Sequence, residues 1–115
     1  MLPSPDDFIE IAVADLKILR DANDLSFRLI DCREDDEWQL CRIEGSELIP
    51  LSCFAAKVAA WDDADATPIV VLCHHGMRSL QATQYLRAKG FEHTFSVAGG
   101  IDAWSVEIDP MVPRY

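Results

Sequence analysis

The sequence lacks the segments that would direct a protein into or across a membrane. Its longest strongly apolar run is Ile69 to Cys73, which is far too short to cross a bilayer. The first residues, Met1 to Asp7, have neither the basic start nor the apolar stretch of a signal peptide. We therefore predict a cytoplasmic protein without a membrane partner.

Closely spaced cysteine pairs are also missing. No two of the four cysteines have the spacing of a Cys-x-x-Cys redox motif or a zinc knuckle: Cys32, Cys41, Cys53 and Cys73. Because the sequence shows no secretion signal, reduced thiols are expected rather than disulfides. The sequence therefore predicts no metal site, and it gives no indication of a cofactor.

Basic residues are scarce, since 10 of them face 20 acidic residues and the net charge is −10. A basic face supplies most of the attraction to nucleic acids and anionic membranes, so neither is expected as a partner. Acidic residues are themselves absent from Pro68 to Phe91, where Arg78, Arg87 and Lys89 are present. A buried strand explains this absence only as far as Leu72.

The chain has no internal repeat and no low-complexity segment, and its 115 residues predict one domain spanning 1–115. Short apolar segments predict strands at 8–11, 27–30, 47–49, 69–72 and 94–97. Helices are expected at 15–20 (ending near Asn23), at 52–61 with Ser52 as N-cap, at 79–89 before Gly90, and at 101–104.

The strands alternate with helices, and the polar run Asp31 to Glu37 and the acidic segment Asp62 to Thr67 are expected to connect them. Such alternation predicts a three-layer α/β domain, with a mainly parallel five-stranded sheet flanked by helices. Ile69 to Leu72 is rich in β-branched residues, as is typical of a strand buried on both faces of a parallel sheet.

Cys73 directly follows this central strand, and the next helix is expected about six residues later. Ligands of α/β sheets bind where a strand passes into a helix. Backbone N–H groups and the helix dipole form an anion site there, which would lower the pKa of a cysteine and favour its thiolate. Gly76 suits a sharp turn or a positive φ.

The first turn of that helix holds Arg78 and Ser79, where Asp or Glu is usual. A positive residue at the positive end of a helix dipole indicates that an anion is normally bound nearby. These features predict a reactive Cys73, although a buried cysteine without function at a strand end is the alternative.

Cys73 to Ser79 resembles the active-site loop of the rhodanese family, whose pattern is Cys-x-x-Gly-x-Arg/Ser. Three further segments resemble family motifs in the right order: 29–34 the "Asp-Val-Arg" signature, 42–50 the segment ending in "Ile-Pro", and 97–104 "Gly-Gly-x-x-x-Trp". The ending 107–115 is similar to rhodanese domains at the C-terminus of ubiquitin-activating-like, sulfur-transferring enzymes.

The resemblance implies that the Cys73 thiolate accepts a sulfane sulfur from thiosulfate or from a persulfidated protein. It would then pass this sulfur to a thiol or to a sulfur-carrier protein. The substrate-binding loop would comprise His74, His75, Gly76, Met77, Arg78 and Ser79, with Arg78 holding an anionic donor. Asp31 and Arg33 would support the loop through an ion pair or hydrogen bonds.

Some positions depart from the family pattern. Cys41-Arg42 replaces the family's Gly-His, and Cys32 stands where valine is common. A resolving role for Cys41 or Cys53 is open. His74 and His75 are expected to shape the mouth of the site and, as neighbours in sequence, to point apart, which disfavours a metal pair.

Two other functions compete with sulfur transfer. Related phosphatases use Cys-x5-Arg, one residue longer than the Cys-x4-Arg from Cys73 to Arg78, and no acid follows closely that could protonate a leaving alcohol. A regulatory or interaction module without catalysis is the second alternative, and the presence of Cys73 argues against it.

Overall fold

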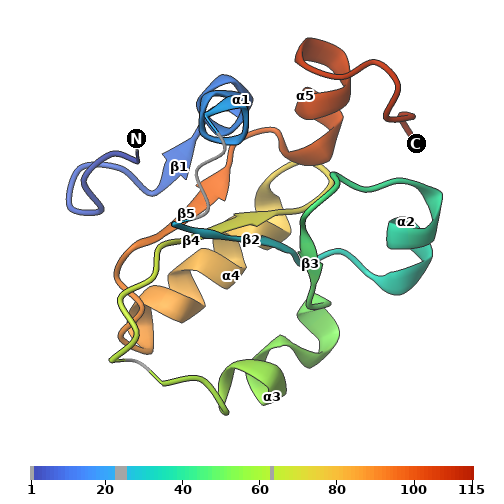
Figure 1. The fold of residues 1–115 in the computed structure, drawn as a ribbon. Helices are drawn as coiled ribbons and strands as arrows, with labels where there is room; N and C mark the ends of the chain where they lie inside the picture. The colour runs from blue at the N-terminus through green and yellow to red at the C-terminus, as the bar shows by residue number, and fades with distance from the viewer. Residues whose placement is uncertain (1, 23–25, 63) are drawn as a thin grey trace.

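Five short strands form one parallel sheet in a computed structural model, which describes residues 2–22, 26–62 and 64–115 (Figure 1). The strands are β1 Glu10–Ile11, β2 Arg28–Asp31, β3 Glu47–Leu48, β4 Ile69–Leu72 and β5 Thr94–Val97. Their order in the sheet is β1-β5-β4-β2-β3, and neighbouring strands run parallel. The predicted five-stranded parallel sheet is confirmed.

Helices cover both faces of the sheet (Figure 1). The helices α1 Val13–Asp21 and α5 Gly100–Glu107 pack on one face, and α3 Phe54–Val58 and α4 Met77–Ala88 pack on the other. The short helix α2 Asp35–Leu40 lies beside the β3 edge of the sheet. The predicted three-layer arrangement is therefore confirmed.

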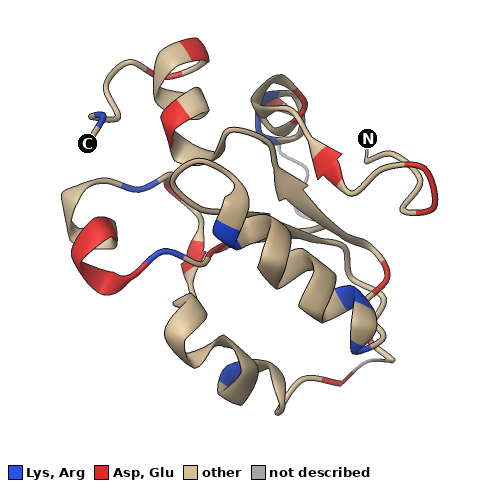
Figure 2. Cartoon of the chain, turned by 180° about the vertical axis from the view of Figure 1, so that it is seen from behind, with Lys and Arg blue, Asp and Glu red and all other residues tan. Residues whose placement is uncertain are grey.

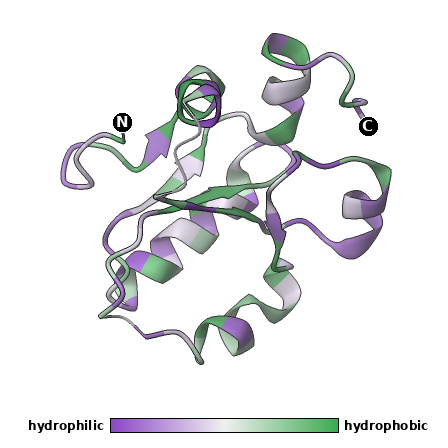
Figure 3. Ribbon diagram, viewed as in Figure 1, coloured by the Kyte–Doolittle hydropathy of each residue, from purple (hydrophilic) through white to green (hydrophobic). Residues whose placement is uncertain are grey.

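The central strand β4 explains why both faces need a cover. All four of its side chains are buried, and they alternate between two hydrophobic clusters. Val70 and Leu72 face α1 and α5, whereas Ile69 and Val71 face α3 and α4. Figure 3 shows this apolar centre between helices of mixed hydropathy. None of the helices in the described ranges has the length and apolarity to cross a membrane.

Two segments differ from the sequence prediction because polar contacts shape them. The helix α2 begins within the polar run that was expected to be a connection, and none of its residues is buried. A capping box holds its start, where the Glu34 N–H donates to Glu37 Oε1 at 3.1 Å. Ser52 is not an N-cap, since its hydroxyl donates to Glu34 Oε1 at 2.7 Å.

The remaining helix boundaries shift by a few residues. A 3₁₀ turn, η1 Leu51–Cys53, precedes α3, which ends three residues before the predicted end at Trp61. The helix α4 begins at Met77 rather than Ser79, and α5 extends from Gly100 to Glu107. The predicted end of the first helix near Asn23 lies outside the described residues.

Candidate active site

Cys73 is the first residue after β4, and it leads into a tight loop before α4. Gly76 is the N-cap of α4 and has a φ of +103°, as the sharp turn requires. A Cβ on Gly76 would lie 3.1 Å from the Gly99 nitrogen, so this position also allows two loops to approach each other. The Cys73 side chain is enclosed, with 1% of the residue exposed.

Hydrogen-bond donors from the start of α4 converge on the Cys73 sulfur. The backbone N–H groups of Gly76 and Ser79 donate to Sγ at 3.1 and 3.3 Å, and Ser79 Oγ lies 3.4 Å from it. The Ser79 hydroxyl is in turn 2.7 Å from Ser96 Oγ on β5. This cradle favours a negatively charged sulfur at the end of β4.

Cys32 is a second thiol at the same site. It follows β2 as Cys73 follows β4, and the register pairs the preceding residues, Asp31 and Leu72. Both cysteines belong to the same buried cluster. The neighbouring Cys32 thiol is the largest factor that lowers the pKa of Cys73 to about 4, and together with the hydrogen bonds from Ser79 and Gly76 it outweighs the opposing effect of burial.

The pKa of Cys32 moves in the opposite direction. It is raised mainly by the interaction with the negatively charged Cys73 sulfur and then by burial. From the sequence, Cys32 is a departure from the family pattern and a resolving role is open for Cys41 and Cys53, but the place of Cys32 beside Cys73 is not predicted. Their positions in the sequence could have indicated that the two cysteines lie close together, since Cys32 and Cys73 each come directly after a buried strand. All four cysteines are free thiols.

The helix α5 supports the loop from the other side. The N–H groups of Ile101 and Asp102 donate to the carbonyl oxygens of Cys73 and His74 at 2.8 and 3.1 Å. Gly100 makes this approach possible, because a Cβ there would lie 2.3 Å from the Cys73 oxygen. The Gly-Gly sequence before α5 thus brings the helix start against the backbone of the loop.

Arg78 is paired with a carboxylate of the same chain. Its two terminal nitrogens donate to Glu37 Oε1 and Oε2 at 2.6 and 2.9 Å. This bidentate contact is the largest factor that lowers the pKa of Glu37 to about 2, and it raises the pKa of Arg78. Sequence reasoning inferred an anion at this helix start but did not identify Glu37, which is on the acidic helix α2 (Figure 2).

Asp31 and Arg33 form a fully buried ion pair beneath the site, with 2.7 Å between Arg33 Nη2 and Asp31 Oδ2. Arg33 Nη2 also donates to the Cys41 oxygen at 2.7 Å, and its Nη1 donates to the Tyr115 hydroxyl at 2.9 Å. The guanidinium therefore ties the end of β2 to the segment after α2 and to Tyr115. These contacts fit a supporting position rather than one facing a substrate.

Tyr115 covers the loop and was not singled out from the sequence. Its ring stacks on His74 at a centroid distance of 3.9 Å and an angle of 7°, and its hydroxyl donates to Glu37 Oε2 at 2.6 Å. The expectation that His74 and His75 point apart is wrong, because their rings stack at 3.9 Å. Burial is the main factor that lowers the pKa of His74, with the neighbouring His75 adding to it.

The other loop residues lie nearer the solvent. His75 Nδ1 is 3.9 Å from Asp102 Oδ2, and Met77 is 82% exposed at the mouth of the site. Within the described ranges, no cluster of three or more potential metal-ligating side chains was found.

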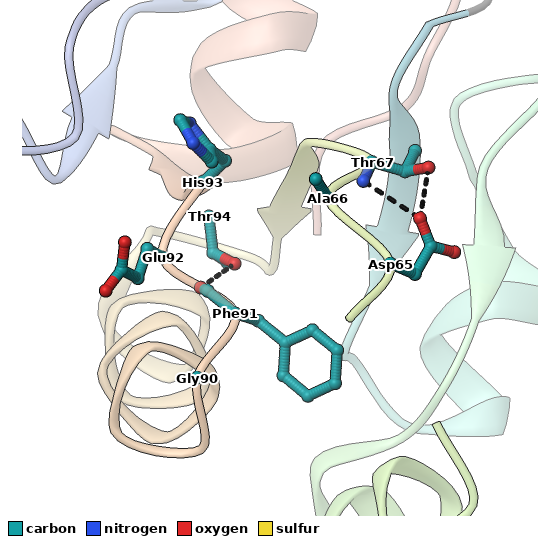
Figure 4. Close-up of a pocket in the computed structure, with 8 residues that line it drawn as sticks. All are labelled: Asp65, Ala66, Thr67, Gly90, Phe91, Glu92, His93 and Thr94. Atoms are coloured by element: carbon teal, nitrogen blue, oxygen red, sulfur yellow. Dashed lines mark hydrogen bonds between the residues drawn. The ribbon is translucent and has the colours of Figure 1, made fainter. Parts of the chain in front are cut away.

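A separate pocket lies at the other end of the strands (Figure 4). It has a volume of about 230 Å³ and is lined by residues 65–67, before β4, and 90–94, which lead into the first residue of β5. The polar side chains of Thr67 and Thr94 bond to Asp65 and to the Phe91 oxygen within its walls. Cys73 follows the carboxyl end of β4, so this pocket is not part of the cysteine site.

Comparisons with known proteins agree with this geometry. A family model described as a Rhodanese-like domain matches residues 12–107. "Adenylyltransferase and sulfurtransferase MOCS3-2" from Zea mays is 36% identical over 92 residues, which cover 76% of this chain but 19% of that protein. "Thiosulfate sulfurtransferase GlpE" from Pseudoalteromonas translucida is 32% identical over 107 residues, covering 93% of this chain and 98% of GlpE.

A solved structure extends the agreement to the fold. The rhodanese-related protein from Thermoplasma volcanium has a TM-score of 0.75 and 30% identity, and the match covers 88% of this chain and 94% of that one. The chain thus corresponds to about a fifth of the maize protein and to nearly the whole of GlpE. With the family model matching most of its length, the chain belongs to the rhodanese family.

Proposed function

We propose that this chain is a sulfurtransferase that carries sulfur on Cys73 as a persulfide. The observation that carries the proposal is the pair of backbone N–H groups, from Gly76 and Ser79, that donate to the buried Cys73 sulfur at 3.1 and 3.3 Å. Together with the neighbouring Cys32 thiol, they lower the pKa of Cys73 to about 4, so the thiolate is the resting form at neutral pH. A thiolate is the nucleophile that sulfur transfer requires.

In the first step, the Cys73 thiolate attacks the outer sulfur of the donor. A new S–S bond forms on Cys73, the S–S bond of the donor breaks, and its electron pair leaves with sulfite (from thiosulfate) or with a thiolate (from a persulfide). In the second step, an acceptor thiolate or carrier attacks the outer sulfur and the Cys73 thiolate returns. The same N–H groups stabilise the charged sulfur before and after transfer.

Phosphate-ester hydrolysis is less well supported. Arg78 follows Cys73 by five positions, one fewer than in the related phosphatases, and its guanidinium is bound by Glu37. A phosphatase needs that guanidinium for the phosphoryl oxygens.

The proposal is tested by intact-protein mass spectrometry after incubation with thiosulfate or with an organic persulfide. The wild-type chain should gain the mass of one sulfur atom, and cyanide should remove it. Cys73→Ala should gain none, whereas Cys53→Ala, which removes a partly buried thiol elsewhere, should behave like the wild type. Sulfur transfer that persists in Cys73→Ala would refute the mechanism.

A further inference from the structure

Arg78 is the one arginine or lysine between Cys73 and Ser79, so it is the natural contact for a negatively charged sulfur donor. Its guanidinium is nevertheless occupied by Glu37 through two hydrogen bonds of 2.6 and 2.9 Å. The charge of Arg78 is thus compensated within the chain. An incoming anion has to compete with a carboxylate that is already in place.

The Glu37 carboxylate is held in place by contacts other than Arg78, so it competes with any incoming anion for the Arg78 guanidinium. Its Oε1 also accepts the Glu34 N–H at 3.1 Å, and its Oε2 accepts the Tyr115 hydroxyl at 2.6 Å. The side chain is only 15% exposed. Tyr115 is itself bonded to the buried Arg33 and stacked on His74, so the carboxylate is fixed from several directions.

The negative charge of Glu37 affects thiosulfate and organic persulfides to different extents. Thiosulfate carries two negative charges and releases sulfite, which also carries two. An organic persulfide carries at most one negative charge at its reacting group, reacts in the form R–S–SH and releases R–S⁻, which carries one. Because the electrostatic energy of a donor scales with its charge, a carboxylate beside the site disfavours thiosulfate more than a persulfide.

We propose that Glu37 is a specificity-determining residue that neutralises Arg78 and directs the site toward organic persulfides and away from thiosulfate. The inference rests on the proposed function and names the donor class within it. In the preferred reaction, Cys73–S⁻ and R–S–SH give Cys73–S–SH and R–S⁻, and the proton then passes to R–S⁻ to leave Cys73–S–S⁻ and R–SH. No further oxidant or reductant takes part.

The test compares kcat/KM for thiosulfate with kcat/KM for cysteine persulfide. Glu37→Gln keeps the size of the side chain but removes its charge, so the value for thiosulfate should rise about tenfold. A singly charged species gains half the energy, which corresponds to a rise of about threefold or less for cysteine persulfide. The ratio of the two values is the quantity that matters.

Two control variants separate this effect from general changes in charge or structure. Asp36→Asn removes one negative charge from an exposed position of the same helix and should leave the ratio as in the wild type. Glu37→Asp keeps a carboxylate and should retain the preference for the persulfide. A lower or unchanged kcat/KM for thiosulfate in a folded Glu37→Gln protein would overturn the inference, as would an equal rise with both donors.

A second measurement does not depend on sulfur transfer, and its wild-type part requires no variant. The rates at which iodoacetate, an anion, and neutral iodoacetamide alkylate Cys73 report the local electrostatic potential. In the wild type, the ratio of these rates should not exceed that of an unstructured cysteine peptide, and it should rise about threefold in Glu37→Gln. If the ratio of the iodoacetate rate to the iodoacetamide rate in the wild type were well above that of the peptide, the charge of Arg78 would not be neutralised by Glu37. If no donor places sulfur on Cys73 while the alkylation ratios follow expectation, the proposed function fails although the charge assignment stands.

Discussion

At the scale of single residues, the site is built around one sulfur atom whose partners differ in kind. Gly76 and Ser79 contribute backbone N–H groups, which any sequence with this loop shape would provide. Cys32 acts on the pKa of Cys73 through its side chain, and this contribution depends on the residue itself. The acidity of Cys73 can therefore be altered by a side chain on the neighbouring strand, without changing the loop.

Replacing Cys32 by valine should make Cys73 less acidic. Valine fills similar space but cannot donate, so the largest factor that lowers the pKa of Cys73 is lost. The pH midpoint of Cys73 alkylation by iodoacetamide, expected near 4 in the wild type, should rise by about one pH unit or more.

The control for this experiment is Cys32→Ser, whose hydroxyl can still donate and should keep the midpoint nearer to the wild-type value. An identical midpoint in Cys32→Val and the wild type would show that the neighbouring thiol does not tune Cys73.

At the scale of elements, two helix starts meet at the loop. The first N–H groups of α4 point at the sulfur, and those of α5 bind the carbonyl oxygens of Cys73 and His74. Close packing between α5 and the loop depends on Gly100, which has a φ of +59°. The glycine pair is thus a requirement of both space and backbone conformation.

Gly100→Ala should lower the free energy of unfolding by about 2–4 kcal/mol. The new Cβ would lie 2.3 Å from the Cys73 oxygen and 2.6 Å from the His74 oxygen, so the loop and α5 would have to separate. Denaturant unfolding followed by circular dichroism measures the loss.

Gly45→Ala is the matched control, because its φ of +87° is also positive but its nearest neighbour is the end of the Arg20 side chain at 3.5 Å. It should cost only the backbone strain, about 1 kcal/mol. Equal losses in both variants would mean that the contact with the loop does not matter.

The sequence was informative for elements with a clear apolar pattern. The run Ile69 to Leu72 predicted the central strand, and Cys73 and Gly76 could then be placed at the turn after it. The helix α2 could not be predicted in this way, because it has no buried residue and is held by the capping contacts of Glu34 and Glu37. Its position matters for the site, since it carries the partner of Arg78.

At the scale of the whole molecule, Glu37 links segments that are far apart in the chain. It bonds to Arg78, 41 positions later, and to Tyr115, 78 positions later. Such pairings come from the arrangement of the sheet and helices, and no local pattern in a single sequence reveals them. For this reason, the reactive cysteine was predictable, whereas the charge balance around it was not.

The stability of the fold should report this linkage at low pH. The pKa of Glu37 is about 2 in the folded chain and 4.5 in its ordinary state, so its contribution is complete above about pH 4.5 and is lost as the pH falls toward 2. Above pH 5, Glu37→Gln should lower the free energy of unfolding by about 2 kcal/mol.

Urea titrations of the wild type and Glu37→Gln between pH 2 and pH 7 measure the difference in their free energies of unfolding. This difference should approach zero as the pH falls toward 2. A difference that is independent of pH would mean that the ionised carboxylate is not the stabilising form.

The start of α5 holds the backbone of the Cys73 loop in place. The carbonyl groups of the loop and the N–H groups at the start of α4 already form hydrogen bonds before a sulfur atom is transferred. The dipoles around Cys73 are therefore already oriented for a negative charge. Moving that charge outward by one sulfur atom then requires little reorganisation of the protein. The speed of transfer would be governed by how a donor reaches the recessed sulfur past Met77 and His75, and the loop would act as a rigid electrostatic template.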